Sequence, residues 1–399
     1  MKLDKQTWRR IVAVDMLFLC FSLNVSLVGQ MFDSMKTYYG LSFSQGGLLL
    51  SMQSVGGLLL SVVCILFISA LNKTKLLVVC GVLLCSMLMV VGVLPPLFLL
   101  FVVFAALGFS GGTINTLANS VMVDIVPARA ERYITFLHML FSLGAVVSPI
   151  LAQGIFPAVG LTGVFLLFGG FALCWGAYAL YAFRSQVKPR MLTCRVSFSV
   201  QLRAAVAVLK TRGMGITFGI SILITAWQLS AIYYISSYFT QLSGNEMQGA
   251  LALSLLFLGM MVSRLLYARI ADRFPKGRVL LLTNAAGLLA WMAVLFVPDY
   301  HIKYIFVVLA ALFCGNNFPI TFSTACRIVP HNTAAASGFV NLGYYIAIFT
   351  IIPLVGTLGD TLGLGNALLC LALPLLLMIP ASLLLHKRLI SSVSPRQGS

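Results

Sequence analysis

The tetrapeptide Asp124-Ile125-Val126-Pro127 returns 203 residues later as Arg327-Ile328-Val329-Pro330, in a chain of 399 residues. Each copy is followed by an apolar, Gly-bearing segment that reaches a proline, Pro149 in the first copy and Pro353 in the second. Because the offset is half the chain, the two motifs predict a parallel internal duplication.

The segments around both motifs are too apolar for a water-soluble domain. Hydrophobic residues make up 60% of the chain and charged residues 9%, with a mean hydropathy of +1.02, whereas soluble domains carry about 25% charged residues. A membrane-spanning helix needs about 20 mostly apolar residues. The sequence therefore predicts an all-α membrane protein with twelve transmembrane helices, in two pseudo-symmetric six-helix bundles. The expected spans lie at about 11–33, 45–70, 75–95, 97–124, 132–156, 161–183, 213–240, 246–270, 277–297, 303–326, 332–357 and 363–386.

The distribution of basic residues supports this count and orients the chain. With twelve spans, 23 of the 26 Lys and Arg residues fall on the side of the two termini, and only Lys36 and Lys303 fall on the other, while Arg264 lies within a span. Because basic residues concentrate in cytoplasmic loops, both termini are expected in the cytoplasm. Short loops indicate a plasma membrane of the bacterial inner-membrane type.

The longest polar stretch, residues 184–212, divides the spans six and six. It is expected to be a cytoplasmic linker between an N-terminal bundle (1–183) and a C-terminal bundle (213–399). The net charge of +17 is spread between apolar runs, a pattern that does not predict nucleic-acid binding. Eight of the nine Cys residues lie in apolar stretches and are expected to be small core residues. No metal or other cofactor is predicted.

One loop carries a family resemblance. The stretch from Arg264 to Leu280 reads Arg-Leu-Leu-Tyr-Ala-Arg-Ile-Ala-Asp-Arg-Phe-Pro-Lys-Gly-Arg-Val-Leu, and it resembles the helix 8 to helix 9 signature of the major facilitator superfamily. The resemblance implies the major facilitator fold and a gating role for Arg264, Asp272, Arg273 and Arg278. Arg264 is expected to neighbour other gate residues rather than an anionic substrate. The corresponding first-half loop, residues 70–75, lacks the acid and the glycine.

Helices 4 and 5 carry a narrower resemblance. Gly108, Gly112, Asn115 and Asn119, followed by Leu137-His138 and the Gly144-Ala145 to Pro149 segment, are similar to the fucose permease branch and its sugar-carrying relatives. By that comparison the proton-coupling acids of the branch fall at Asn115 and near Val25, where this chain has no carboxylate. His138 and Asp33 then become the candidate proton-coupling residues.

Polar side chains within predicted spans are the candidate substrate ligands, because a polar group at lipid depth is costly unless it is paired or faces a wet cavity. Amides can bond sugar hydroxyls, and aromatic faces can stack on a sugar ring. Each candidate either contacts the solute or bonds a neighbouring helix. The candidates are Asn24, Gln53, Asn115, Asn119, His138, Trp227, Gln228, Asn316, Asn317, Asn341 and Tyr344.

These observations predict a monomeric secondary transporter in membrane lipid that moves a small polar solute, a sugar or a related polyhydroxylated compound, by alternating access. H⁺ and Na⁺ are the candidate coupling ions. The alternative within the same fold is an exporter of drug-like or metabolite solutes. A membrane-embedded enzyme is disfavoured because the nine acids lie mostly at span ends and the one deep His stands without a catalytic motif. A passive channel is disfavoured because no ring-forming filter motif occurs.

Overall fold

The computed structural model describes residues 4–67, 72–127, 130–184, 203, 206–208, 210–270, 274–329 and 333–393. The main helices are α1 (Lys5–Gln30), α2 (Phe32–Tyr39), α3 (Phe43–Phe67), α4 (Lys73–Gly92), α5 (Leu97–Ile125), α6 (Ala130–Phe183), α8 (Met214–Ser243), α9 (Glu246–Ile270), α10 (Lys276–Phe296), α11 (Tyr300–Cys314), α12 (Asn317–Ile328), α13 (Thr333–Leu362), α14 (Leu364–Leu369) and α15 (Ala372–Val393). Within the described residues the regular structure is entirely helical, as predicted.

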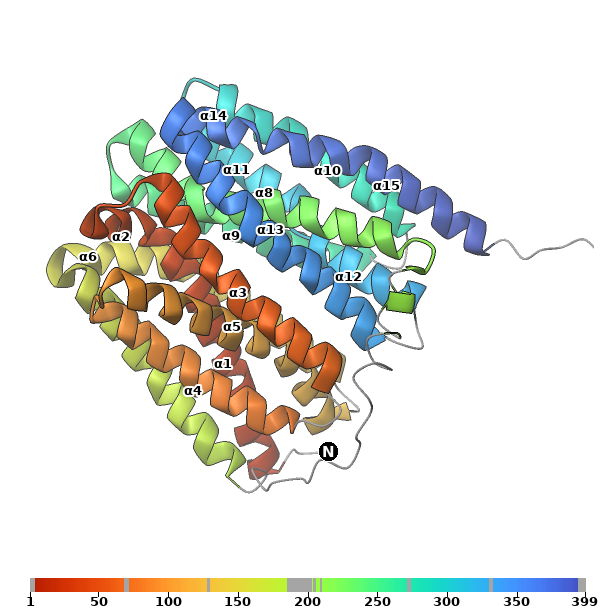
Figure 1. The fold of residues 1–399 in the computed structure, drawn as a ribbon, viewed down its shortest axis with the longest axis horizontal. Helices are drawn as coiled ribbons and strands as arrows, with labels where there is room; N and C mark the ends of the chain where they lie inside the picture. Colours follow the sequence, from red (N-terminus) through yellow and green to blue (C-terminus); the bar gives the residue numbers. More distant parts are fainter. Residues whose placement is uncertain are drawn as a thin grey trace, which may run out of the picture.

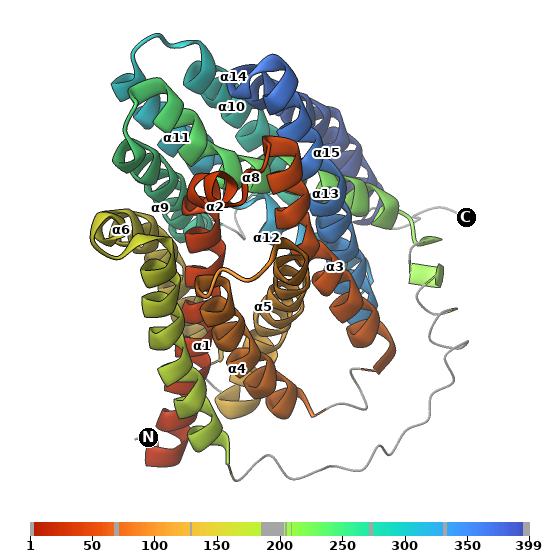
Figure 2. The ribbon, with the colours of Figure 1, turned by 60° about the vertical axis from the view of Figure 1, so that its left-hand side comes forward.

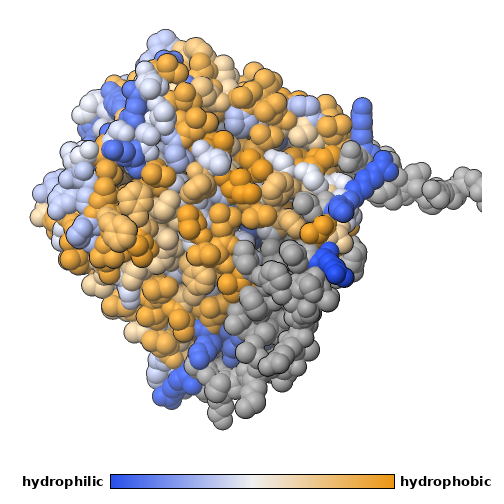
Figure 3. Space-filling model, in the orientation of Figure 1, coloured by the Kyte–Doolittle hydropathy of each residue, from blue (hydrophilic) through white to orange (hydrophobic). Residues whose placement is uncertain are grey.

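Ten helices in this part of the chain are long and apolar enough to cross a membrane. The longest, α6, turns back at Gly160 (φ 64°, ψ −175°) and so contains two of the predicted spans. The 25-residue α3 is not among the ten, and it occupies the predicted second span. With both taken into account, the arrangement matches the twelve predicted spans. Apolar residues cover most of the face in Figure 3, and hydrophilic residues gather toward its edges.

The structure corrects several predicted boundaries. The first helix begins at Lys5 rather than near residue 11, because the Asp4 side chain accepts the N–H of Thr7 at 2.8 Å and caps it. It ends at Gln30, where the chain turns into the separate helix α2. The predicted tenth span is interrupted at Gly315 between α11 and α12, and the predicted twelfth is interrupted between α14 and α15.

The helices form two groups, which lie on different sides of the molecule (Figures 1 and 2). The first group is α1 to α6 and the second is α8 to α15. They meet mainly where α3 packs on α13 and α6 packs on α9, with α1 beside α8. The predicted linker, residues 184–212, lies mostly outside the described residues, so the predicted division into domains stays a prediction.

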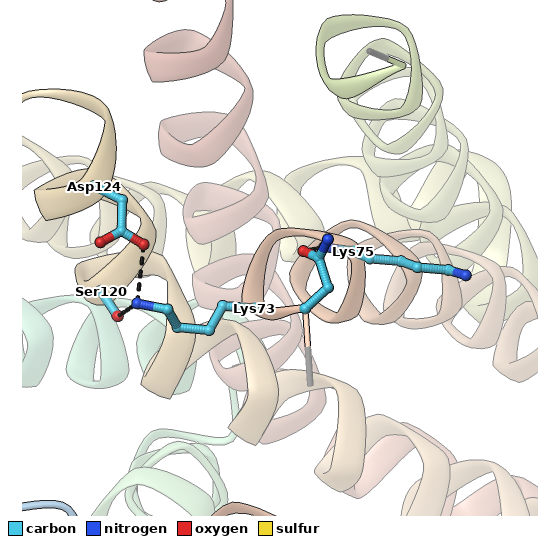
Figure 4. A network of polar contacts seen from close by, with 5 residues as sticks. Lys73, Lys75, Ser120 and Asp124 are labelled. Atoms are coloured by element: carbon cyan, nitrogen blue, oxygen red, sulfur yellow. Dashed lines mark hydrogen bonds and ion pairs between the residues drawn. The ribbon is translucent and has the colours of Figure 1, made fainter. Parts of the chain in front are cut away.

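The alternating helix directions give the molecule two ends. We call the end where α1 begins and α3 finishes the basic end, and the other the opposite end. At the basic end the duplication is visible in side-chain contacts. Lys73 donates to the Ser120 hydroxyl at 3.0 Å (Figure 4). Lys276, 203 residues later, donates to the Ser323 hydroxyl at 2.6 Å. Asp124, which pairs with Lys73 at 2.9 Å, is replaced by an arginine in the second copy.

Candidate functional site

One polar cluster between the two groups centres on His138. Its Nε2 lies 3.1 Å from Asn119 Oδ1, which joins α6 to α5. One turn further along α6, Ser142 donates to the His138 carbonyl at 3.0 Å and accepts from Arg264 Nη1 of α9 at 3.4 Å. The guanidinium also lies 5.8 Å from the centroid of the Phe141 ring. We call these five residues the His138 cluster; it joins three helices and both groups.

Aromatic residues of α1 hold the imidazole in place. Phe18 meets His138 edge to face, with ring centroids 5.2 Å apart at 88°, and lies 5.5 Å from Phe141. Phe21 lies 5.5 Å from Phe141 as well. Because these rings pack side by side, the imidazole has little freedom to turn away from Asn119.

A second contact between the groups involves α3, α5 and α13. Gln53 donates to the Tyr233 hydroxyl at 3.4 Å, from α3 to α8. The Tyr345 ring of α13 lies so close to Gly57 and Gly112 that a Cβ at either position would overlap it. Asn115, one turn from Gly112 on α5, is half-buried. This region therefore brings together amide and phenol groups from four helices.

Two predicted ligands are buried without a hydrogen-bond partner for one of their side-chain polar atoms. Asn24 and Trp227 are each 1% exposed, and their Oδ1 and Nε1 atoms have no hydrogen-bond partner within the described residues. Trp227 meets Trp291 of α10 edge to face at 5.5 Å. Asn24 follows Phe21 by one turn, and Phe21 lies against Gly111 of α5. The role of both residues in binding stays a prediction.

Some of the second-half candidates bond helices of their own group, and others are half-buried on α13 and α8. Asn316 donates to Ser263 at 2.8 Å and Asn317 donates to Asn284 at 2.7 Å, so both bond helices of their own group. Asn341 and Tyr344 are half-buried on α13, and Tyr344 packs on Phe318 and on Tyr345 with centroids 5.5 and 5.0 Å apart. On α8, half-buried Gln228 contacts Met260 Sδ at 3.6 Å.

Of the predicted gate residues, Asp272 and Arg273 lie outside the described residues, and Arg278 is exposed at the start of α10. Arg264 belongs to the His138 cluster. Asp33, the second proton-coupling candidate, lies on the short helix α2 at the opposite end. Burial raises the pKa of its carboxyl, and the nearby charge of Lys36 opposes part of that effect.

The opposite end holds two polar contacts that the sequence analysis missed. Ser236 donates to Gln30, Gln30 to Gln153, and Gln153 to Glu246, at 2.9, 3.1 and 2.7 Å. This chain of hydrogen bonds ties α8 to α1, α6 and α9. Gln30 and Gln153 stand out in the sequence because they are polar residues within apolar runs. Nothing in the sequence indicates that they bond each other.

The other missed contact joins α13 to the start of α3. Asp360 accepts the backbone N–H groups of Phe43 and Ser44 at 2.8 and 2.7 Å, and Ser44 lies 3.0 Å from Thr357 through their hydroxyls. No pattern in the sequence connects residues more than 300 positions apart. The His138 cluster lies deeper than both contacts, toward the basic end.

Long apolar helices in two groups, joined by polar contacts at the opposite end and by the His138 cluster, define a multi-pass membrane protein of the transporter class. A model of the Major Facilitator Superfamily matches residues 14–351, and also 216–397. The chain therefore belongs to the Major Facilitator Superfamily, and it is a transporter rather than an enzyme.

Solved structures show the same fold at low sequence identity. A bacterial homologue of the human lysosomal transporter Spinster, in an inward-facing and unoccupied conformation, has a TM-score of 0.76 at 13% identity, covering 99% of this chain and 100% of its own. A variant of the nucleoside transporter NupG has 0.76 at 13%, covering 94% and 99%. A variant of the E. coli fucose:proton symporter FucP has 0.67 at 14%, covering 94% and 98%. No curated protein sequence matches the chain.

Among the described residues, no three His, Cys, Asp or Glu side chains come together as a metal site.

Proposed function

We propose that the protein is a secondary active transporter that carries a small hydroxylated solute, a sugar or a related compound, across a bacterial inner membrane by alternating access. The observation that carries the proposal is the His138 cluster, a hydrogen-bonded set of polar side chains within the spans where the two groups meet. A hydroxylated solute needs donors and acceptors that can exchange their protein partners for its own hydroxyls. Asn119, His138 and Gln53 supply such groups.

Alternating access requires contacts that can break at one end while the other end closes. Hydrogen bonds of Asp360 and of the Gln30–Gln153–Glu246 chain join the groups at the opposite end. The proposal takes the present conformation as closed there and open toward the basic end, which the distribution of basic residues assigns to the cytoplasm, with both termini. NupG and FucP, which share the fold, are a nucleoside transporter and a fucose:proton symporter, and both solutes carry hydroxyl groups.

A thermal-shift screen of the purified protein in detergent tests the proposal. The panel contains monosaccharides, nucleosides, amino acids and lipophilic cations, applied to the wild type and to Asn119→Ala and His138→Ala. A ligand that binds only the folded state raises the unfolding midpoint by mass action. A hydroxylated solute should stabilise the wild type and lose its effect in both variants. Asn366→Ala, at an exposed position on α14, is the matched control and should keep the full shift.

Stabilisation by lipophilic cations alone would refute the hydroxylated-solute assignment and favour an exporter of drug-like solutes. Equal shifts in the wild type and in both site variants would remove the His138 cluster from the binding site. The quantity compared between proteins is the change in midpoint caused by the ligand. A lower unliganded midpoint in His138→Ala therefore does not affect the comparison.

Coupling to a proton is part of the proposal, with Asp33 and His138 as the candidate carriers. Asp33 qualifies because burial raises its pKa toward the range in which it can exchange protons. Solute uptake into proteoliposomes should be driven by an imposed pH gradient and reduced in Asp33→Asn. Uptake that follows a Na⁺ gradient and ignores the pH gradient would replace the proton with Na⁺.

A further inference from the structure

Arg264 carries a positive charge into the His138 cluster, and within the described residues it forms no ion pair. Its guanidinium contacts the neutral Ser142 hydroxyl at 3.4 Å and the Phe141 ring at 5.8 Å. Its Nε atom is buried and has no hydrogen-bond partner in the described part of the chain. The one ion pair found there is Lys73 with Asp124, at the basic end. The guanidinium therefore has donors to spare at the junction of the two groups.

A cation in this position is costly unless something balances it. Arginine stays protonated, and its five N–H groups form a planar fork that matches a carboxylate or phosphate. At membrane depth an uncompensated charge costs several kcal/mol or more. The Ser142 hydroxyl offers one long, neutral bond and already donates to the His138 carbonyl. The cation–π contact is long, at 5.8 Å from the ring centroid, and contributes little. These contacts leave most of the guanidinium unsatisfied.

The groups that face Arg264 argue against an internal counter-charge. From α6 they are Phe141 and Ser142, with His138 one turn away, and from α1 the rings of Phe18 and Phe21 lie behind them. None of these side chains is an acid. Arg264 is itself half-buried rather than fully enclosed, so a solute can reach it.

We infer that the solute is anionic: a hydroxylated compound bearing a carboxylate or a phosphate, which binds Arg264 while its hydroxyls bond Asn119 and its neighbours. This inference rests on the proposed function and deepens it. It differs from the sequence-based expectation, which placed Arg264 among the gate residues. The guanidinium contacts α6 of the other group, so the anion would be bound where the two groups meet.

Matched hexose ligands test the inference. Glucose, galactose and mannose are compared with their uronates and their 6-phosphates in a thermal-shift titration, so that only the group on the sixth carbon changes. Acetate and inorganic phosphate are added as anions without a sugar. Proteins are the wild type, Arg264→Gln, Arg264→Lys and the control Arg327→Gln, which removes an exposed charge at the basic end of α12.

The expected result is that an anionic hexose binds the wild type about 10- to 100-fold more tightly than its neutral counterpart, since charged hydrogen bonds contribute about 1.5–3 kcal/mol. Arg264→Gln should abolish the preference and Arg264→Lys should keep part of it. Arg327→Gln should keep it in full. Because Arg264→Gln removes an unbalanced charge, its unliganded midpoint should not fall. The comparison of uronate with 6-phosphate identifies which anion is carried.

Equal binding of neutral and anionic hexoses, unchanged in Arg264→Gln, would overturn the anionic inference and leave the hydroxylated-solute proposal standing. Arg264-dependent stabilisation by acetate or phosphate, without any effect of the hexoses, would uphold the anion site and refute the sugar. Stabilisation by lipophilic cations alone would overturn both.

Discussion

Removing the Asp360 carboxylate should open the opposite end of the molecule. Asp360 stands at the end of α13, and both its oxygens accept backbone N–H groups at the first turn of α3, at 2.8 and 2.7 Å. The first N–H groups of a helix have no partner within the helix and carry its positive dipole end. A carboxylate from the other group therefore caps α3 and ties the groups together.

The size of the effect follows from these two bonds. A hydrogen bond to a charged group contributes about 1.5–3 kcal/mol, and the helix dipole adds about 0.3–1 kcal/mol. Asp360 is exposed, so water and salt weaken both terms. We expect a loss of about 1–2 kcal/mol for Asp360→Ala, which changes the ratio of closed to open molecules by about 5- to 30-fold.

Hydrogen exchange measured by mass spectrometry on a peptide covering residues 41–50 reports this change. Exchange at Phe43 and Ser44 should speed up by about the same factor in Asp360→Ala, since their N–H groups lose their acceptor. Loss of the cap alone would also speed that exchange, so a second peptide around Gln153 and Glu246 is followed. It should also exchange faster if the two groups separate.

Asp299→Ala is the matched control. Asp299 caps α11 by accepting the N–H of His301 at 2.7 Å, within the second group. It should lower stability and leave exchange around residues 41–50 and Gln153 unchanged. Unaltered exchange around Gln153 in Asp360→Ala would refute the claim that this carboxylate holds the opposite end closed.

Three further results are expected. Gly108→Ala should lower the free energy of unfolding by about 1–3 kcal/mol in a denaturant titration, because its Cβ would overlap the α3 backbone. Gly170→Ala is the control: Gly170 has open space around it, so this change should be neutral or stabilising by up to about 1 kcal/mol. The raised pKa of Asp33 means that the folded state binds the Asp33 proton more tightly than the unfolded state does. Stability should therefore fall as the pH rises from about 4 through the folded pKa. Asp33→Asn should reduce that fall in the melting midpoint between pH 4 and 8. Lys73→Ala should cost less than about 1 kcal/mol, a loss that disappears in high salt, because its ion pair with an acid is exposed.

The sequence predicted the fold well because the features that specify it are local. Apolar length defines a span, and a polar or Gly-bearing break ends one, so the turn at Gly160 was placed correctly between the fifth and sixth spans. The duplication was readable because Asp124 to Pro127 and Arg327 to Pro330 lie in matching registers. The boundaries that failed depended on caps and kinks, such as Asp4 at the start of α1, which apolar length does not encode.

The candidate site was predictable by residue type and not by pairing. A histidine and amides in apolar spans are conspicuous, so Asn119 and His138 were named, and the structure brings them within 3.1 Å. Trp227 carries the same signal, yet it packs on Trp291 of its own group. Which face a polar residue presents depends on how the neighbouring helices pack. Asp360 illustrates the limit, since its partners Phe43 and Ser44 are distant in sequence.

The duplication also explains why the candidate site is asymmetric. The lysine–serine contact at the basic end survives in both copies, because it holds neighbouring helix ends together in each group. At the His138 cluster the copies differ: 203 residues after His138 stands Asn341, and 203 residues after Asn119 stands Phe322. The first group therefore supplies the imidazole of His138 and the amide of Asn119, and the second supplies the cation through Arg264. A solute that binds both sides is fully held only while the groups meet around it. The binding energy of the solute then shifts the equilibrium between the conformations in which the two groups are close and apart. Alternating access requires this coupling between binding and conformation.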